Sequence, residues 1–364
     1  MVTDGRRRVM IAVDDSEVSS YAFTWGIRNL IRTDDHVVVL TAAPFTGVDF
    51  PTADMATGTE YGGKGVRMSD ILVAGTEYGV PIIPTDEDAE AANISITSSS
   101  KNLVNKYLQL LLQSNISCEG EVVKGDAGSW IADEGERLKA DVIIVGSSAS
   151  GLVKRALLGS ISDYVLHNAP CTVAVVRQSE EALSKHDPLA SSGGPRKIVI
   201  AVDESKEAIN AFKWALKNFC TPQDHVVVYH VHQPYVAPIT GLGTGEFGIE
   251  EVYTLPDVAV KDEVASLKDS QKVVEKFMEF AQVQTEIKCE GMVVSGQTQE
   301  KVIEGLNALR ADAVVVGTHD RSAVSRTFLG SVSDHLAHNS PCPLIVVKTG
   351  KNVHEPEMGH QHVV

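Results

Sequence analysis

The sequence predicts an α/β protein of two similar units in tandem, each with a five-stranded, parallel, doubly wound sheet flanked by helices. Apolar segments rich in Val and Ile alternate along the chain with amphipathic segments of helical length. The apolar segments are continuous, as is typical of parallel strands buried on both faces. Such alternation of strands and helices indicates β-α-β crossovers and a parallel sheet. The whole pattern then occurs a second time.

An internal repeat relates the two halves of the chain. Residues 6–30, RRRVMIAVDDSEVSSYAFTWGIRNL, align without gaps with residues 195–219, PRKIVIAVDESKEAINAFKWALKNF. Later in the repeat, SCEGEVVKGDAG matches KCEGMVVSGQTQ, so that Cys118 corresponds to Cys289. With 364 residues the chain is long enough for two domains, and we expect one for each copy of the repeat.

Each unit has the predicted order β-α-β-α-β-α-β-α-β. In the first unit the Val- and Ile-rich segments predict strands at 9–13, 36–42, 117–123, 142–145 and 172–176. The amphipathic segments between them predict helices at 17–31, 101–112, 127–138 and 160–167. In the second unit we expect strands at 197–202, 225–231, 286–294, 313–316 and 344–347. Its helices are expected at 206–218, 262–282, 299–309 and 331–338.

Composition marks the domain boundaries, which we expect at residues 1–177 and 196–350. Residues 178–195, QSEEALSKHDPLASSGGP, are polar and rich in Gly, Pro and Ser, as is typical of a linker. Residues 44–100 predict a long loop with short ordered pieces. Residues 351–364 predict a flexible tail.

The overall charge and the cysteine count restrict the partners and the compartment. The net charge is 32 − 48 = −16, which argues against nucleic acid or an anionic membrane as a partner. No apolar segment approaches the roughly 18 residues that span a bilayer, and the N-terminus lacks the apolar segment of a signal peptide. The odd number of cysteines, five, favours reduced thiols. We therefore expect a cytoplasmic protein.

Three strand ends in each unit are expected to meet. In open parallel sheets, ligands bind outside the carboxyl ends of the strands, where the strand order reverses. The first, second and fourth strands of the first unit end at Asp14, Ala42 and Gly146. The corresponding ends in the second unit are Asp203, Val231 and Gly317. These ends are candidates to line one crevice in each unit.

A glycine motif follows the fourth strand of both units. Gly146 ends the strand, a loop follows, and Gly159-Ser160 opens a helix. The same arrangement returns with Gly317, Gly330 and Ser331. A helix N-terminus offers free N–H groups and a partial positive charge, so it suits a phosphate. A single glycine loop can be a tight strand–helix connection and nothing more, but its recurrence in both units favours a nucleotide site.

This motif resembles that of the ATP-binding members of the universal stress protein family, which carry Gly-x2-Gly-x9-Gly-Ser/Thr at this place. The resemblance covers nearly all of both units. It implies two Rossmann-like domains, binding of ATP or AMP with or without Mg²⁺, and a role in the stress response. Both units depart from the pattern at its second glycine, where Ala149 and Asp320 stand.

The resemblance assigns roles position by position. Asp14 and Asp203 match the Asp that contacts the nucleoside, although a helix N-cap is their structural alternative. Ala42 and Val231 match the position whose backbone meets adenine. The ribose-phosphate cradle corresponds to Gly146, Ala149, Gly159, Ser160 and Ile161 in the first unit and to Gly317, Asp320, Gly330, Ser331 and Val332 in the second.

The two departures from the motif differ in their consequences. Ala149 adds one methyl group, which costs on the order of 1 kcal/mol where the backbone needs a positive φ. Asp320 sets a carboxylate against a phosphate well inside the Debye length of about 8 Å. Arg321, Arg326 or Mg²⁺ can offset that repulsion. We therefore expect the first unit to be the better ATP site and the second to be weakened.

The residue chemistry points to a nucleotide and to no fast reaction. The sequence shows no recognisable catalytic triad, zinc motif or Walker Asp, so at most slow ATP hydrolysis is expected. The leading hypothesis is a nucleotide-dependent switch or interaction module. Ala149 and Asp320 favour the alternative, an interaction protein of this fold that binds no nucleotide. An ATPase or nucleotidyl transferase also stays open, as does the choice among ATP, AMP and cyclic AMP.

The last strand of each unit would leave an exposed sheet edge. In the family, domains pair through their last strands, and residues 172–176 and 344–347 can pair in the same way. Pairing would remove two edges that otherwise invite association. One chain would then imitate a homodimer, and dimerisation of the whole chain stays open.

Overall fold

The structure, a computed structural model, describes residues 5–43, 86–147, 158–177, 195–234, 256–318 and 329–348. Within these ranges the side chains of residues 86–94, 256–260 and 262 are not described. Residues 44–85 of the expected loop, residues 178–194 of the expected linker and the expected tail at 351–364 lie outside the described residues.

The strands and helices of both units lie where the sequence predicts them. The first unit has the strands β1 (Arg8–Ala12), β2 (His36–Ala43), β3 (Ser117–Lys124), β4 (Val142–Ser147) and β5 (Thr172–Arg177). Its helices are α1 (Glu17–Asn29), α2 (Asp86–Gln113), α3 (Ala127–Arg137) and α4 (Ser160–Asn168). The second unit has the strands β6 (Lys197–Ala201), β7 (His225–His232), β8 (Lys288–Ser295), β9 (Ala313–Gly317) and β10 (Leu344–Val347). Its helices are α6 (Lys206–Asn218), α7 (Pro256–Gln284), α8 (Thr298–Leu309) and α9 (Ser331–Asn339).

Two helices begin earlier than expected, and one of them changes the predicted loop. Helix α2 starts at Asp86 and not near residue 101, so residues 86–100 are helical where a loop was expected. Helix α7 starts at Pro256, ahead of the expected residue 262. The sequence of α2 hides its start because AEAANISITSSS has no strong apolar periodicity. The acidic residues of its first turn, in DEDAE, lie at a helix N-terminus, where negative charge is favourable.

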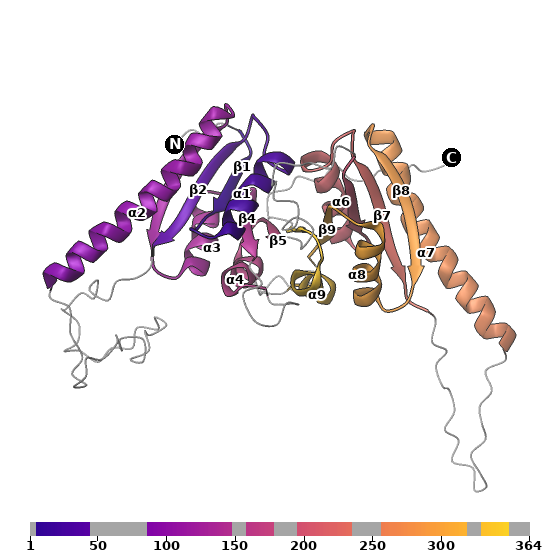
Figure 1. Cartoon of the computed structure of the whole chain (residues 1–364). Helices are drawn as coiled ribbons and strands as arrows, with labels where there is room; N and C mark the ends of the chain where they lie inside the picture. Colours follow the sequence, from indigo (N-terminus) through magenta and orange to yellow (C-terminus); the bar gives the residue numbers. More distant parts are fainter. Residues whose placement is uncertain are drawn as a thin grey trace, which may run out of the picture.

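The strands described form one sheet in the order β3-β2-β1-β4-β5-β10-β9-β6-β7-β8 (Figure 1). Within each unit the neighbouring strands are parallel. In the first unit the chain places β2 and β3 on one side of β1 and then β4 and β5 on the other, so the strand order reverses between β1 and β4. The second unit repeats this arrangement. The expected parallel, doubly wound architecture is confirmed.

The last strands of the two units pair with each other. β5 and β10 are antiparallel, with Val173 opposite Val346 and Val175 opposite Leu344. The expectation that one chain joins its two sheets edge to edge is therefore confirmed. The pairing removes two strand edges from solvent, and β3 and β8 form the ends of the joint sheet.

Two apolar layers cover the faces of the joint sheet. On one face, helices α1, α2, α6 and α7 pack through residues such as Phe23, Tyr107, Phe212 and Phe277. On the other face, α3, α4, α8 and α9 pack against the alternate residues of the same strands. Because successive strand residues point to opposite faces, strands buried on both sides must be apolar throughout, as the sequence pattern predicts.

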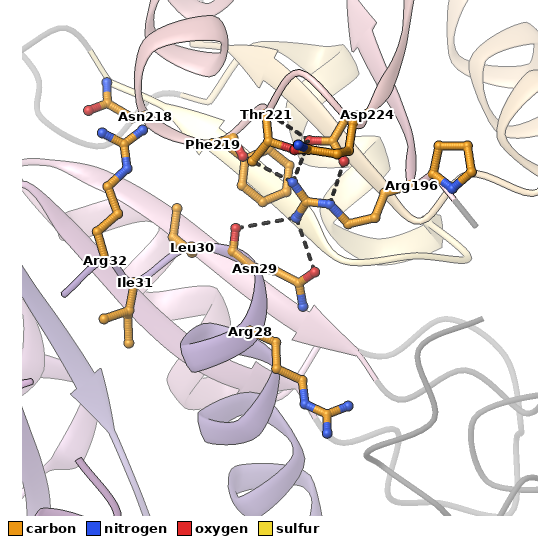
Figure 2. A pocket seen from close by; sticks show the side chains of 12 residues that line it. Arg28, Asn29, Leu30, Ile31, Arg32, Arg196, Asn218, Phe219, Thr221 and Asp224 are labelled. Carbon is orange, nitrogen blue, oxygen red and sulfur yellow. Dashed lines mark hydrogen bonds and ion pairs between the residues drawn. The ribbon is translucent and has the colours of Figure 1, made fainter. Parts of the chain in front are cut away.

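Arginines tie the units together where helices α1 and α6 end, beside a cleft of about 320 Å³ (Figure 2). Arg7 Nη1 donates to the carbonyl oxygen of Asn218 at 3.2 Å. In the opposite direction, Arg196 Nη1 donates to the carbonyl oxygen of Asn29 at 3.3 Å and to its Oδ1 at 3.0 Å. Since the C-terminus of a helix carries partial negative charge, each unit supplies a cation to a helix end of the other.

A second reciprocal contact lies at the ends of β5 and β10, on the opposite face. Arg177 donates to the carbonyl oxygens of Ala337 and His338, which terminate α9. Lys348 Nζ donates to the carbonyl oxygen of Ala169 at 2.7 Å, at the end of α4. The last helix of each unit is therefore capped by a cation from the other unit.

Lys348 gives this contact a pH dependence. Burial lowers the pKa of Lys348 to about 8, from 10.5. Between these two values the unfolded chain binds more protons than the folded protein, so stability rises with pH in that window. We expect the free energy of unfolding of the wild type to gain about 2 kcal/mol relative to Lys348→Met between pH 8 and 10.5. Urea titrations at several pH values measure this difference, and a constant difference would contradict the prediction.

Arg196, which lines the cleft, forms an ion pair with the buried carboxylate of Asp224. Arg196 pairs with Asp224 at 2.5 Å, and the Asp224 side chain is only 2% exposed. Arg196→Met leaves this carboxylate without an ionic partner, and we expect a loss of about 3 kcal/mol in the free energy of unfolding. The control is Arg32→Met at the same cleft. Arg32 is exposed, and within the described residues its guanidinium donates to a carbonyl oxygen, that of Lys217, and to no carboxylate. Equal losses in the two variants, measured by urea denaturation, would refute this role.

Candidate functional site

The strand order brings the predicted site residues of each unit to one edge of the sheet. β1 lies between β2 and β4, with Ala12 opposite Leu40 and Ile11 opposite Ile144. Asp14 follows β1, Ala42 lies near the end of β2, and Gly146 lies near the end of β4. Asp203, Val231 and Gly317 hold the same places on β6, β7 and β9. We call these two groups of strand ends, with the starts of α4 and α9, the first and second crevice.

Asp14 orients the start of helix α1 without being its N-cap. The N-cap is Ser16, whose side chain accepts a hydrogen bond from the N–H of Ser19 at 3.1 Å. Asp14 Oδ1 in turn accepts from the N–H of Ser16 at 3.0 Å and from its hydroxyl at 2.5 Å. Within the described residues Oδ2 has no partner, and Asp14 is exposed. One carboxylate oxygen is therefore available to a ligand.

The second unit repeats this arrangement around its own first strand. Asp203 Oδ1 accepts from the N–H of Ser205 at 2.9 Å and from the Ser205 hydroxyl. Ser205 is the N-cap of α6 and accepts from the N–H of Ala208 at 3.1 Å. The N-caps of α1 and α6 are therefore Ser16 and Ser205, and Asp14 and Asp203, two residues earlier, are not N-caps.

Helices α4 and α9 begin without a side-chain cap. Their N-caps are Gly159 and Gly330, and neither supplies a hydrogen bond to the first turn. The φ angles of these glycines are −63° and −66°, which any residue can adopt. What glycine provides here is the absence of a side chain, and this leaves the first N–H groups of each helix open. Ile161, in the first turn of α4, is 43% exposed.

Gly146 and Gly317 are required by packing of the chain itself. A Cβ atom at Gly146 would lie 3.1 Å from the carbonyl oxygen of Val18 in the first turn of α1. At Gly317 the corresponding distance, to the carbonyl oxygen of Glu207, would be only 2.6 Å. The first helix of each unit therefore approaches the backbone closely at these two glycines. These two glycines set how tightly that helix seats on the sheet beside the crevice.

One buried hydroxyl at the first crevice lacks a partner. Ser147 ends β4, its side chain is 5% exposed, and no hydrogen bond to its Oγ is present in the described residues. By strand alternation Ser147 points to the face that α3 and α4 cover. A buried hydroxyl without a partner costs roughly 1–3 kcal/mol, so a ligand atom at this place would be stabilising.

Two predicted site residues, Ala149 and Asp320, lie outside the described residues, as do Arg321 and Arg326. Of the other predicted residues, Ala42 is half-buried and Val231 is buried. Ser160, Ser331 and Val332 lie in the first turns of α4 and α9.

The second crevice contains a buried histidine that the sequence analysis did not single out. His232 ends β7 next to Val231 and is 1% exposed. Its Nδ1 lies 3.0 Å from Ser270 Oγ and its Nε2 lies 3.1 Å from Glu263 Oε1, both on α7. The first unit has Ala43 at this position of the repeat. The sequence did contain a signal for this difference: the aligned strands read TAA at residues 41–43 and HVH at residues 230–232.

No described helix is long and apolar enough to cross a membrane. No group of three or more His, Cys, Asp or Glu side chains in the described ranges is placed to hold a metal ion.

Comparisons with known proteins agree with this architecture. A sequence model of the universal stress protein family matches residues 5–177 and 194–348. Universal stress protein PHOS34 of Arabidopsis thaliana is 31% identical over 201 residues, which cover 54% of this chain and 71% of that protein. Universal stress protein Mb2028c of Mycobacterium bovis is 23% identical over 349 residues, covering 93% and 96% of the two chains.

A solved structure shares the fold over the whole length. The crystal structure of a universal stress protein from Archaeoglobus fulgidus has a TM-score of 0.53 at 18% identity, and the match covers 94% of this chain and 97% of that one. At this identity the likeness is one of fold alone. Since the family model matches most of the chain, in two consecutive copies, the chain belongs to the universal stress protein family and is a tandem member of it.

Proposed function

We propose that this protein binds an adenine nucleotide, ATP or AMP, in its first crevice and acts as a nucleotide-dependent switch in the stress response. One observation carries the proposal: helix α4 starts at an uncapped glycine and follows β4, which ends at Ser147, a residue whose hydroxyl has no partner in the described residues. Asp14 follows the neighbouring strand β1. Anion donors and a nucleoside acceptor thus lie at one edge of the sheet, where α/β folds bind ligands.

The residues of the first crevice fit the parts of such a ligand. The N–H groups of Ser160 and Ile161 are donors for phosphate oxygens, and the Ser160 hydroxyl adds another. Asp14 Oδ2 can accept from ribose hydroxyls or from the adenine amino group. The backbone near Ala42 meets the base. Mg²⁺ would accompany the phosphates, because it is usually held by phosphate oxygens and waters with only one or two carboxylates.

The second crevice shares this design but carries Asp320 in its glycine motif. A carboxylate close to the phosphates opposes their binding, so we assign the weaker nucleotide affinity to the second unit. The alternative function, an interaction protein that binds no nucleotide, draws its support from this residue and from Ala149.

Helix α4 connects the first crevice to the second unit. Its N-terminus opens into the crevice, and its C-terminal carbonyl oxygens accept hydrogen bonds from Lys348 of the second unit. Helix α9 is held in the same way by Arg177 of the first unit. A ligand that shifts α4 must therefore strain or relax a contact between the units. This gives a switch its two-state element.

The cytoplasm is the compartment that we propose. All five cysteines lie in the described part of the chain and none forms a disulfide. Burial raises the pKa of Cys171 to about 12, so this thiol stays protonated and unreactive at neutral pH. Dimerisation of the whole chain remains an open part of the proposal.

Blocking each helix start in turn tests the assignment of the crevices. Gly159→Val places a side chain over the first N–H groups of α4 without straining the backbone, because φ is −63°. We expect it to weaken ATP binding at least about tenfold, or 1.4 kcal/mol. Gly330→Val is the matched variant and should change the measured affinity little. Isothermal titration with ATP and Mg²⁺ measures both, and equal losses would refute the asymmetry.

A bound nucleotide should also survive purification. We expect mass spectrometry of the denatured wild-type protein to detect a purine nucleotide whose mass identifies ATP, AMP or cyclic AMP. Asp14→Ala removes the nucleoside acceptor and should release it, whereas Glu17→Ala on the same surface should retain it. If the wild type yields no nucleotide and binds none in titration, the interaction protein without a ligand is the correct alternative.

A further inference from the structure

A second cavity lies between helices α6 and α7 of the second unit. Its volume is about 80 Å³, the room that two or three water molecules take up in the liquid at about 30 Å³ each. Its wall is apolar and consists of Ile209, Phe212, Val273, Phe277 and Phe280. It shares Asp203 with the second crevice, but Val231, Gly317 and Gly330 do not line it. The cavity therefore adjoins the second crevice, and Asp203 belongs to both.

The phenylalanines of the cavity wall stand edge to face. The ring centroids of Phe212 and Phe277 are 5.0 Å apart at an interplanar angle of 72°, and those of Phe212 and Phe280 are 6.2 Å apart at 66°. Phe212 and Phe277 are almost fully buried, so the core holds them in place. Aromatic rings prefer edge-to-face or offset neighbours at 4.5–7 Å. Phe280 is half-buried, so of the three it is the ring that a ligand can contact.

Charges of both signs line the same cavity. Lys213 and Lys276 come from the two helices, and Asp203 and Glu204 come from the loop after β6. The ammonium of Lys213 lies 5.5 Å from the centroid of the Phe280 ring. Asp203 uses Oδ1 for Ser205, so Oδ2 faces no partner within the described residues. The two ammonium groups and the two carboxylates together complement a ligand that carries both a negative and a positive charge. A ligand with only one of these charges would leave half of the groups without a partner.

We propose that this cavity binds a free aromatic α-amino acid. The edge of the ring would enter the recess against Phe280. The carboxylate would meet the ammonium groups of Lys213 and Lys276, and the α-ammonium would meet Asp203 and Glu204. Three separate contacts on one tetrahedral carbon require the correct hand, so the site discriminates between enantiomers. The proposal goes beyond nucleotide binding and does not depend on it.

The first unit provides an internal control, because its copy of this place lacks key features. In the aligned repeat, Ser20 stands for Ile209 and Thr24 stands for Lys213. The apolar wall thereby loses a large side chain and the rim loses a cation. The first unit retains an aromatic pair, Phe23 and Tyr107, with centroids 4.5 Å apart. We therefore place a single amino acid site in the chain, in the second unit.

Four related probes test the ligand class on the full chain without nucleotide. Isothermal titration with L-phenylalanine should show one site, and D-phenylalanine should bind about fivefold more weakly or not at all. 3-Phenylpropionate and phenethylamine each lack one charge and should also lose about fivefold. If either single-charge analogue binds as tightly as L-phenylalanine, or if L-phenylalanine does not bind, the proposal is wrong.

Two substitutions test the location. Ile209→Trp fills the cavity and should abolish binding of L-phenylalanine, whereas Ser20→Trp at the matched place of the first unit should leave it unchanged. Lys276→Gln alters an exposed side chain and keeps the fold testable if Ile209→Trp misfolds. It should weaken L-phenylalanine and 3-phenylpropionate about fivefold and leave phenethylamine unaffected. Unchanged L-phenylalanine binding in Lys276→Gln, or in folded Ile209→Trp, would overturn the assignment.

Discussion

The pairing of β5 with β10 is the contact on which the rest of the molecule depends. It joins two five-stranded sheets into one, and it places the C-termini of α4 and α9 beside the strand ends of the opposite units. The cations that end these strands, Arg177 and Lys348, then find carbonyl oxygens left open at the helix ends. On the other face of the sheet, Arg7 and Arg196 likewise donate to carbonyl oxygens at helix ends of the opposite unit. A two-unit chain thus becomes one packed body.

This geometry gives each crevice a mechanical connection to the other unit. In α4 and α9 the end that faces the crevice is uncapped, while the end that faces the interface is capped from across it. Nine residues of helix span only about 14 Å, and a helix of that length moves as a rigid rod. In the proposed switch, a ligand at a helix start would act on the interface through that one helix and the cation at its other end.

Duplication has preserved the frame and allowed the surroundings of the two crevices to diverge. Both units keep the Asp–Ser arrangement at the first helix and the glycine that lets this helix seat on the sheet. The second unit alone places a buried histidine between its second strand and α7. It also lines the neighbouring cavity with phenylalanines and charges. The shared features depend on close packing of the backbone, which tolerates little change. The histidine lies at the end of β7 and the cavity side chains lie mainly on α6 and α7, and the first unit has the same strands and helices without this combination of side chains.

The sequence alone determined the strands, the helices and the duplication, because continuous apolar segments and their repetition follow from burial on both faces of a parallel sheet. It also located Asp14 and the glycine motif, since strand ends and helix starts are local features. Tertiary structure alone decided the roles within the site. The N-cap proved to be Ser16, the space left by Gly146 is taken by Val18, and the hydroxyl of Ser147 has no partner among the described residues. Each of these outcomes depends on which atoms approach across the fold, and such distances leave no periodic trace in a sequence. The same reason explains why the start of α2 and the network of His232 emerged only when the helices were packed on the sheet.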